Sequence, residues 1–146
     1  MVEILDLACI AVSDILADED QLELDRLVDS HNIERSGIED ARLISIMLRS
    51  ADGALFAGLH GYTWGGYCEV KSLWVAEERR GRGLGSLLLT SAEREAKRRG
   101  CGGVLLTTHS FQAPDFYRRH GYREVVSIAD CPVGHAYILM AKTLRA

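Results

Sequence analysis

The chain contains little that would support several common classes of protein. Its longest apolar runs fall well short of the roughly 20 residues that cross a bilayer, and its four cysteines, Cys9, Cys68, Cys101 and Cys131, include no Cys-x-x-Cys pair. That spacing argues against a zinc site and against a disulfide framework, and no His, Asp or Glu cluster has metal-ligand spacing, so we expect no metal. The first residues lack the basic stretch of a secretory signal, which leads us to expect a cytoplasmic protein.

Excess positive charge is also lacking, because the formal net charge is −4, and this argues against general affinity for nucleic acid. The length of 146 residues and the 47% hydrophobic fraction suit one domain covering residues 1–146. Basic residues gather at 79–82 and 94–99. The first group fits an anion site, whereas we expect the second to complement a helix dipole or to be solvated.

Apolar periodicity and turn residues predict strands alternating with helices. The expected strands are Glu3–Leu7, Ala41–Arg49, Ala54–Trp64, Cys68–Val75, Val104–Thr108, Tyr122–Ile128 and His135–Lys142. The expected helices are Asp14–Ser30, with a break near its acidic residues 18–20, Gly85–Arg99 and Pro114–His120. The early strands form an antiparallel meander, and the strand–helix–strand order after it requires a parallel, right-handed crossover. The fold class is therefore mixed α/β.

The most informative segment is the loop Arg80-Gly81-Arg82-Gly83-Leu84-Gly85-Ser86, which lies between a predicted strand and a predicted helix. Unpaired N–H groups at a helix start, glycines and two arginines together predict an anion site, and a phosphorylated cofactor is the natural anion. A Walker loop would need a lysine, and a dinucleotide fingerprint would need a differently placed third glycine and a later acidic residue. The pattern Arg/Gln-x-x-Gly-x-Gly/Ala is matched without a gap by Arg80, Gly83 and Gly85.

This loop resembles the acyl-CoA pyrophosphate loop of the GNAT N-acetyltransferase superfamily. Downstream, Ala113, Phe116, Tyr117, Gly121 and Tyr122 match the family's Ala-x-x-Phe-Tyr-x-x-x-Gly-Phe/Tyr segment. The resemblance covers the chain from about residue 52 to residue 144. It implies a single-domain fold with a mixed, mostly antiparallel sheet of about six or seven strands. It further implies a splay between the fourth and fifth strands and helices on both faces.

The resemblance also implies the chemistry, namely transfer of an acetyl group from acetyl-CoA, a co-substrate, to a primary amine. The amine would attack the thioester directly in a ternary complex. The acceptor could be a small molecule or a protein, and a homodimer is left open. The residues implied to bind acetyl-CoA are Leu73, Trp74, Val75, Arg80, Gly81, Arg82, Gly83, Leu84, Gly85, Ser86, Ser110 and Tyr117. Within this set, the N–H groups of 82–86 would hold the diphosphate, and residues 73–75 would hold the pantetheine arm and the carbonyl.

Two residues are implied to move protons. Tyr117 would protonate the departing CoA thiolate, and its alternative is a core aromatic that only covers the cofactor. Glu69 would accept the proton of the amine, with a pKa raised by partial burial. Its alternative is an exposed carboxylate paired with Lys71, because strand alternation places Glu69, Lys71 and Leu73 on one side of the sheet. Ser110 stands where many family members have asparagine.

Other readings stay open. A non-catalytic acyl-CoA-binding module would keep the glycine loop and lack an acceptor pocket, and a nucleotide-binding enzyme would prefer ATP or NAD to CoA. The histidines His60, His109 and His135 could act as bases or contact substrate, although a lone histidine is more often a structural hydrogen-bonding residue. Trp74 could belong to the core, the cofactor wall or the acceptor wall. The sequence leaves the acceptor amine undetermined.

Overall fold

The computed structural model describes residues 10–144 and divides the chain into two compact units, residues 1–38 and 39–146. The single domain over 1–146 stays a prediction. The predicted strand Glu3–Leu7 lies outside the described residues. No helix in the described part of the chain is long and apolar enough to cross a membrane.

The first unit contains the helix α1, Asp18–Ser36. It begins at the acidic residues where the sequence suggested a break, because negative charge in a first turn complements the positive end of the helix dipole. It ends before Gly37, whose φ of 70° suits a left-handed cap, so the predicted Asp14–Ser30 was set too early at both ends.

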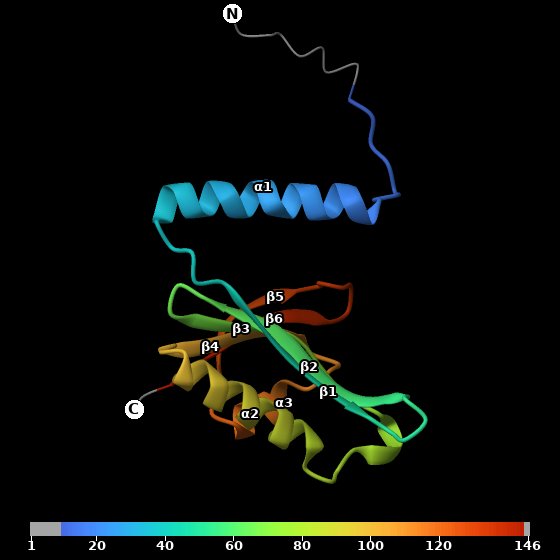
Figure 1. Ribbon diagram of the computed structural model, residues 1–146. Helices are drawn as coiled ribbons and strands as arrows, with labels where there is room; N and C mark the ends of the chain where they lie inside the picture. The colour runs from blue at the N-terminus through green and yellow to red at the C-terminus, as the bar shows by residue number, and fades with distance from the viewer. Residues whose placement is uncertain (1–9, 145–146) are drawn as a thin grey trace, which may run out of the picture. The chain divides into compact units, whose positions relative to one another are not determined.

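The second unit contains a six-stranded sheet of order β1-β2-β3-β4-β6-β5 (Figure 1). Its strands are β1 Arg42–Arg49, β2 Leu55–Trp64, β3 Tyr67–Val75, β4 Gly103–His109, β5 Arg123–Ala129 and β6 Ala136–Thr143. Its helices are the short 3-10 turn η2 Glu77–Arg79, α2 Leu84–Arg98 and α3 Pro114–Arg119. Each predicted element of this unit is present to within one or two residues, and the mixed sheet is confirmed.

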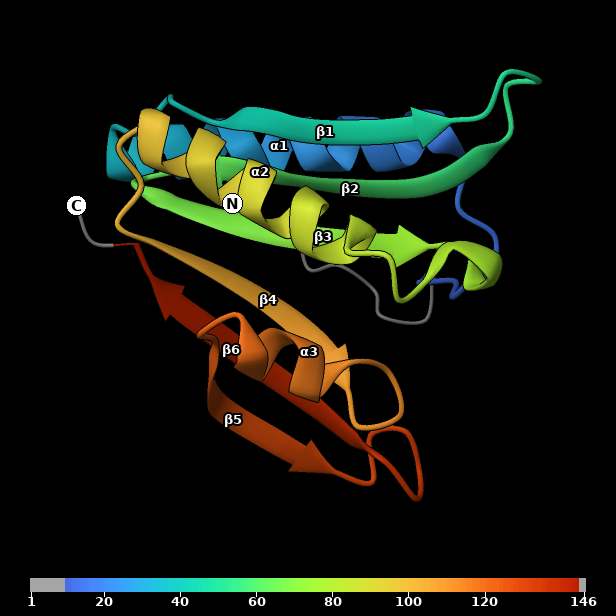
Figure 2. The same cartoon turned by 90° about the horizontal axis from the view of Figure 1, so that it is seen from below.

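The two halves of the sheet meet where β3 and β4 run parallel. Only residues 67–70 of β3 pair with β4, opposite residues 103–106, and beyond Val70 and Leu106 the two strands diverge (Figure 2). The strands β3 and β4 correspond to the fourth and fifth predicted strands, so this divergence is the predicted splay. It leaves the inner edges of Lys71–Val75 and Thr107–His109 without strand partners in the described structure.

A β-bulge in β3 changes which side chains share a face. His60 of β2 lies opposite Ser72, and the next residue, Gly61, lies opposite Val70, so Lys71 has no residue opposite it. The alternation expected from the sequence therefore reverses after Val70. Leu73 turns toward the core beneath α2, and Glu69 stays on the opposite face.

The helices α2 and α3 lie on the same face of the sheet (Figures 1 and 2). The buried side of α2 is formed by Leu88, Leu89, Ala92 and Ala96, a spacing that makes one apolar stripe along a helix. The predicted helix on the other face stays a prediction, because the remaining helix, α1, belongs to the first unit.

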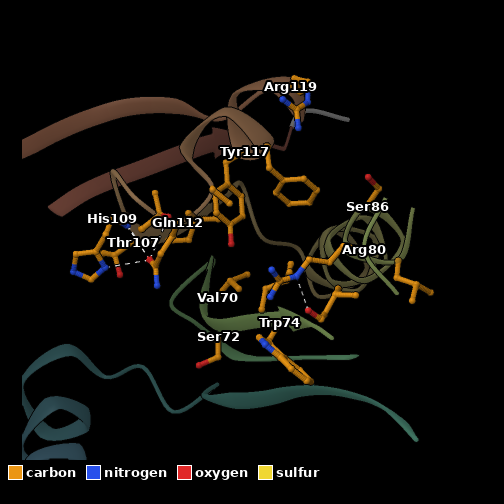
Figure 3. Close-up of a pocket in the computed structure, with 18 of the residues that line it drawn as sticks. Val70, Ser72, Trp74, Arg80, Ser86, Thr107, His109, Gln112, Tyr117 and Arg119 are labelled. Atoms are coloured by element: carbon orange, nitrogen blue, oxygen red, sulfur yellow. Dashed lines mark hydrogen bonds between the residues drawn. The ribbon is translucent and has the colours of Figure 1, made fainter. Parts of the chain in front are cut away.

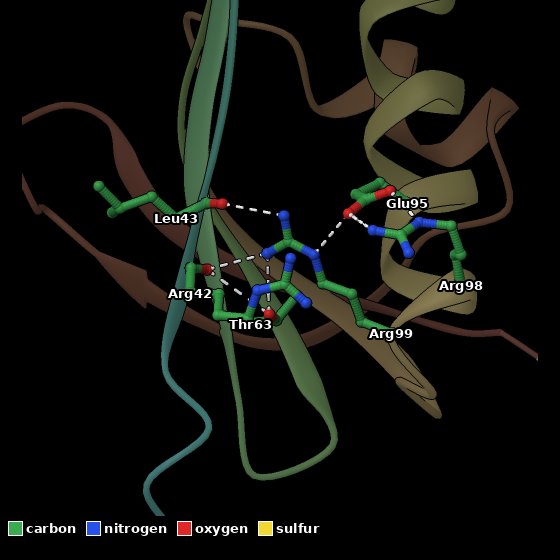
Figure 4. A network of polar contacts seen from close by, with 6 residues as sticks. All are labelled: Arg42, Leu43, Thr63, Glu95, Arg98 and Arg99. Atoms are coloured by element: carbon green, nitrogen blue, oxygen red, sulfur yellow. Dashed lines mark hydrogen bonds and ion pairs between the residues drawn. The ribbon is translucent and has the colours of Figure 1, made fainter.

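The carboxyl end of α2 is fastened to the outer strands by Arg99 (Figure 4). Its Nε donates to Glu95 at 2.7 Å, and its terminal nitrogens donate to the carbonyl oxygens of Arg42 and Leu43 at 3.1 and 3.0 Å and to Thr63 Oγ1 at 3.1 Å. Only 11% of its side chain is exposed. Of the two expected roles, solvation was therefore wrong for Arg99, which links the carboxyl end of α2 to β1 and β2.

We expect Arg99→Met to lower the free energy of unfolding by about 2–3 kcal/mol, because it leaves several partly buried acceptors without a donor. The neighbouring Arg98 is the matched control, since it also binds Glu95 but has 65% of its side chain exposed. Arg98→Met should leave the urea midpoint almost unchanged. Equal losses in the two variants, measured by urea unfolding, would contradict this role of Arg99.

A second polar group ties α2 to the far half of the sheet. The buried carboxylate of Glu93 accepts hydrogen bonds from Tyr122 Oη at 3.0 Å and from Lys142 Nζ at 2.8 Å. Burial, followed by the charge of Glu93, raises the pKa of Tyr122, so that hydroxyl stays a donor at neutral pH. Helix α2 is thus joined to both sides of the splay.

Candidate active site

A cleft of about 1060 Å³ opens at the splay between β3 and β4. Its walls are the diverging part of β3, the loop before α2, the end of β4 and the start of α3. The lining residues are Val70, Lys71, Ser72, Leu73, Trp74, Val75, Arg79, Arg80, Gly81, Gly83, Leu84, Gly85, Ser86, Leu106, Thr107, Thr108, His109, Phe111, Gln112, Ala113, Phe116, Tyr117 and Arg119. Most of the predicted acetyl-CoA residues are therefore brought together here.

The glycine loop forms one end of the cleft. Gly81 and Gly83 have φ values of 73° and 80°, a conformation that favours glycine, and Gly83 is the N-cap of α2. Among the described residues, no group of the chain accepts a hydrogen bond from the backbone N–H groups of 81–86. These donors lie at the positive end of the helix dipole, so the loop can bind an anion.

Two arginines flank this loop. Arg80 Nε donates to the carbonyl oxygen of Val75 at 2.9 Å, which fixes its side chain against the end of β3 (Figure 3). The guanidinium of Arg79 lies 4.1 Å from the centre of the Phe56 ring. Each arginine is held by a contact of its own, and their positive charges line the same wall of the cleft.

Helix α3 packs closely on the loop. A Cβ added at Gly85 would lie 3.3 Å from the Phe116 ring, so glycine permits this approach. Nδ1 of His120 faces the carbonyl oxygen of Phe116 at 2.8 Å and must donate to it, and Nε2 is hydrogen-bonded to the Ser86 hydroxyl at 2.9 Å. The side chain of Ser86 is therefore held by α3.

Tyr117 lies between the two ends of the cleft, and its hydroxyl points into the open space (Figure 3). The ring is packed edge-on against Phe116 and Tyr122, with centroids 5.2 and 5.8 Å away. Burial raises the pKa of Tyr117, so the phenol keeps its proton at neutral pH. A protonated hydroxyl that faces the cleft can serve as a proton donor.

Glu69 is placed differently from the expectation. It does not line the cleft, and its carboxylate accepts hydrogen bonds from Tyr62 Oη at 2.5 Å and from Lys71 Nζ at 2.9 Å. Burial pushes its pKa up, but the Tyr62 and Lys71 donors outweigh burial, and the pKa is lowered. The expected rise in pKa was wrong, because the cross-strand partner Tyr62 could not be read from the sequence.

Two predicted cofactor residues, Ser110 and Arg82, are also absent from the lining of the cleft in the described structure. The hydroxyl of Ser110 accepts a hydrogen bond from the backbone N–H of Ala136 at 2.9 Å, and the backbone N–H of Ser110 donates to the Ala136 carbonyl at 2.9 Å. Ser110 thus fastens its loop to β6.

Several lining residues were not singled out from the sequence, among them Thr107, Phe111, Gln112 and Arg119. Arg119 comes two residues after Tyr117, on the helix that carries the Phe-Tyr motif, and this neighbourhood was the available signal. Gln112 lies in the loop that follows β4. Its side-chain oxygen is hydrogen-bonded to His109, and no sequence pattern predicts these hydrogen bonds. Figure 3 shows its contact with His109 at the end of the cleft away from Arg80 and Ser86.

The comparisons with known proteins agree with this geometry. The profile of the family described as "Acetyltransferase (GNAT) domain" matches residues 45–124, which is more than half of the chain. The chain therefore belongs to the GNAT family of acetyltransferases and is an acyltransferase enzyme. Enzymes of this family use acetyl-CoA.

Relatives with curated names support the same assignment. An acetyltransferase of Agrobacterium fabrum is 34% identical over 113 residues, which cover 77% of this chain and 82% of that protein. The blasticidin-S acetyltransferase of Streptomyces morookaense is 39% identical over 116 residues, which cover 77% of this chain and 85% of the relative. A crystal structure from Agrobacterium tumefaciens, assigned to the acetyltransferases, has a TM-score of 0.84 and 30% identity, with 92% of this chain and 98% of that chain covered.

Proposed function

We propose that this enzyme transfers the acetyl group of acetyl-CoA to a primary amine, with both substrates bound at once. The observation that carries the proposal is the cleft, because three features line it together. These are the unbonded N–H groups of residues 83–86, the unpaired edge of β3 and the hydroxyl of Tyr117. The anion site matches the diphosphate of acetyl-CoA, and the strand edge matches its amide-rich arm. The proton donor matches the thioester of the same molecule.

The residues present fit acetyl-CoA, which is a substrate of the reaction. The N–H groups of 82–86 would bind the diphosphate, with Arg79, Arg80 and Arg119 supplying positive charge. The inner edge of Leu73–Val75 would bind the pantetheine amides as a neighbouring strand does. A backbone N–H at this strand end would stabilise the charge that develops on the thioester oxygen.

Direct attack by the amine agrees with the placement of the cysteines. Among the described residues no cysteine lines the cleft, and burial raises the pKa of Cys68 to about 11. A thiol of that pKa is a poor nucleophile at neutral pH, so a covalent acyl-cysteine step is not favoured here. In the proposed reaction Tyr117 gives its proton to the departing thiolate, and a base removes a proton from the amine.

The test is release of free CoA from acetyl-CoA in the presence of a panel of primary amines. The panel should include blasticidin S, because the 39% identical relative is named for it, together with polyamines, aminoglycosides and lysine peptides. Initial rates measured while both substrates vary should give intersecting double-reciprocal lines. Parallel lines would contradict the ternary complex, and binding of acetyl-CoA without release of CoA for any amine would contradict the proposed transfer. The cytoplasmic location and a homodimer stay predictions.

A further inference from the structure

A polar contact behind the glycine loop has no part in the acetyl transfer proposed above. It joins His120, the C-cap of α3, to Ser86 in the first turn of α2, with 2.9 Å between Nε2 and Oγ. The imidazole is half-buried and packs on the Phe116 ring, with centroids 4.4 Å apart. Histidine gains or loses a proton between pH 5 and pH 8, so this contact can change its charge near neutral pH.

One nitrogen of the His120 ring has a fixed role. Nδ1 lies 2.8 Å from the carbonyl oxygen of Phe116, which can only accept, so Nδ1 carries a proton in either charge state of the ring. A change of protonation must therefore occur at Nε2, the nitrogen that faces Ser86. The charge state of the ring thus alters its hydrogen bond to α2 and leaves its bond to Phe116 in place.

The direction of the bond between Nε2 and Ser86 reverses with the charge of the ring. A neutral ring has a lone pair on Nε2, so the Ser86 hydroxyl donates to it. A charged ring has a proton on Nε2 and donates to Oγ, which leaves the hydroxyl hydrogen of Ser86 available to another acceptor. The charged ring therefore adds a positive charge and an available hydroxyl donor at the start of α2, and both changes favour an anion there.

Ser86 connects this ring to the anion site of the cleft. It lines the cleft at the end that Arg80 also lines (Figure 3), and its backbone N–H is one of the donors without a partner among the described residues. Because Oγ and this nitrogen belong to one residue, Nε2 of His120 lies within about 7 Å of the N–H donor. A diphosphate held by that donor would lie within about 10 Å of Nε2, which is the screening length at about 0.1 M salt.

The other charged groups near the ring do not compensate a proton on Nε2. The titratable and charged residues on the elements around it are Asp115, Tyr117, Arg118 and Arg119 of α3, Tyr122 after α3, Arg80 and Arg82 before α2, Glu93 of α2 and Lys142 of β6. The two carboxylates of this set are each bound to a cation, Asp115 to Arg118 at 2.7 Å and Glu93 to Lys142 at 2.8 Å. In the part of the chain that the structure describes, His120 forms no ion pair with a carboxylate. An anion at the loop would therefore be the first negative charge to compensate the charged ring.

We propose that His120 couples binding of the acetyl-CoA diphosphate to uptake of a proton on Nε2, and that Ser86 connects the ring to the bound anion. This proposal rests on the proposed binding of acetyl-CoA at the glycine loop. The bound anion favours the charged ring, and by linkage the charged ring raises the affinity for the anion by the same factor. The gain in affinity is fully present below the pH at which the free ring titrates. It is lost as the pH rises through the higher titration midpoint of the complex.

The first test is calorimetry with 3′-dephospho-CoA, which keeps the diphosphate and lacks the phosphomonoester, so the ligand itself takes up no proton between pH 6 and pH 8. Titrations at pH 7 in two buffers of different ionisation enthalpy give the number of protons bound with the ligand. We expect uptake of several tenths of a proton, and an affinity about three- to ten-fold higher at pH 6 than at pH 8. Release of protons, or binding without proton exchange, would overturn the proposal.

The variant that isolates the ring is His120→Gln, because a glutamine amide still offers hydrogen bonds and does not titrate. Above the titration range of histidine both proteins are neutral at this position, so their dissociation constants at pH 8 should agree within about two-fold. The variant should lose most of the proton uptake and of the pH dependence. His31→Gln is the matched control, since His31 is exposed and lies on α1, in the first unit. Uptake that persists in His120→Gln, or that disappears in His31→Gln, would overturn the proposal.

Proton NMR of the unaltered protein gives a readout that needs neither an acceptor amine nor a variant. The His120 ring signals, assigned through their contact with the Phe116 ring, should titrate at a pH about one unit higher with 3′-dephospho-CoA bound than without it. An identical titration curve in the two states would overturn the proposal. These failures differ from failure of the proposed function, in which the protein binds no CoA or releases none with any amine.

Discussion

Tyr117→Phe should lower kcat by about 100-fold and change the dissociation constant of acetyl-CoA by less than about two-fold. The reason is that phenylalanine keeps the ring packed between Phe116 and Tyr122 and removes only the hydroxyl that points into the cleft. A leaving thiolate must then depart without a proton donor. Steady-state kinetics and calorimetry with CoA would separate turnover from binding.

Tyr122→Phe is a useful comparison for that substitution, because Tyr122 lies in the same aromatic cluster and its hydroxyl binds buried Glu93 instead of facing the cleft. Its loss should reduce the free energy of unfolding by about 1–3 kcal/mol, since Glu93 loses a donor. If Tyr117→Phe turned over as fast as the unaltered enzyme, Tyr117 would be a packing residue only.

Leu84→Pro should weaken acetyl-CoA binding by about 10- to 100-fold relative to Leu84→Ala. Both variants lose the leucine side chain, and only proline lacks the backbone N–H that we assign to the diphosphate. Leu84 is the first residue of α2, and its N–H has no partner within the helix; proline also disfavours the ψ of 5° that Gly83 adopts, which adds to the loss at this loop. A hydrogen bond to a charged group contributes about 1.5–3 kcal/mol, which gives this range.

Isothermal titration with CoA and with CoA lacking its diphosphate portion would measure the effect. The difference between the two Leu84 variants should disappear for the shortened ligand, because it makes no contact with the loop. Circular dichroism should show the same helix content in both variants. Equal affinities of the two variants for full-length CoA would show that the backbone N–H groups of residues 82–86 do not bind the diphosphate.

The glycine loop could be predicted from the sequence because its chemistry is local. Arg80, Gly83 and Gly85 are close neighbours in the chain, and the left-handed turn that their spacing requires depends on few distant contacts. The strand order around the crossover was predictable for a similar reason, since strand, helix and strand in succession permit one hand of connection. The divergence of β3 and β4 followed from the family resemblance alone.

The parts that were missed depend on partners far apart in the sequence. Glu69 was expected to have a raised pKa, and the bulge at Lys71 with the cross-strand hydroxyl of Tyr62 gave the opposite result. Arg99 was expected to complement the helix dipole or to be solvated. Its side chain instead donates hydrogen bonds to carbonyl oxygens of β1 that lie 56 and 57 residues away in the sequence. For His109, the residue type was visible in the sequence, whereas the orientation of its ring depends on one amide oxygen of Gln112.

The short ladder between β3 and β4 has a mechanical consequence. Residues 67–70 and 103–106 form the only paired stretch, or seam, between the two halves of the sheet in the described structure, so few backbone hydrogen bonds join the halves directly. A ligand that lies along Lys71–Val75 would extend the seam by several hydrogen bonds. Amide hydrogen exchange of β3 should then slow on binding, even at positions that never contact the acetyl group.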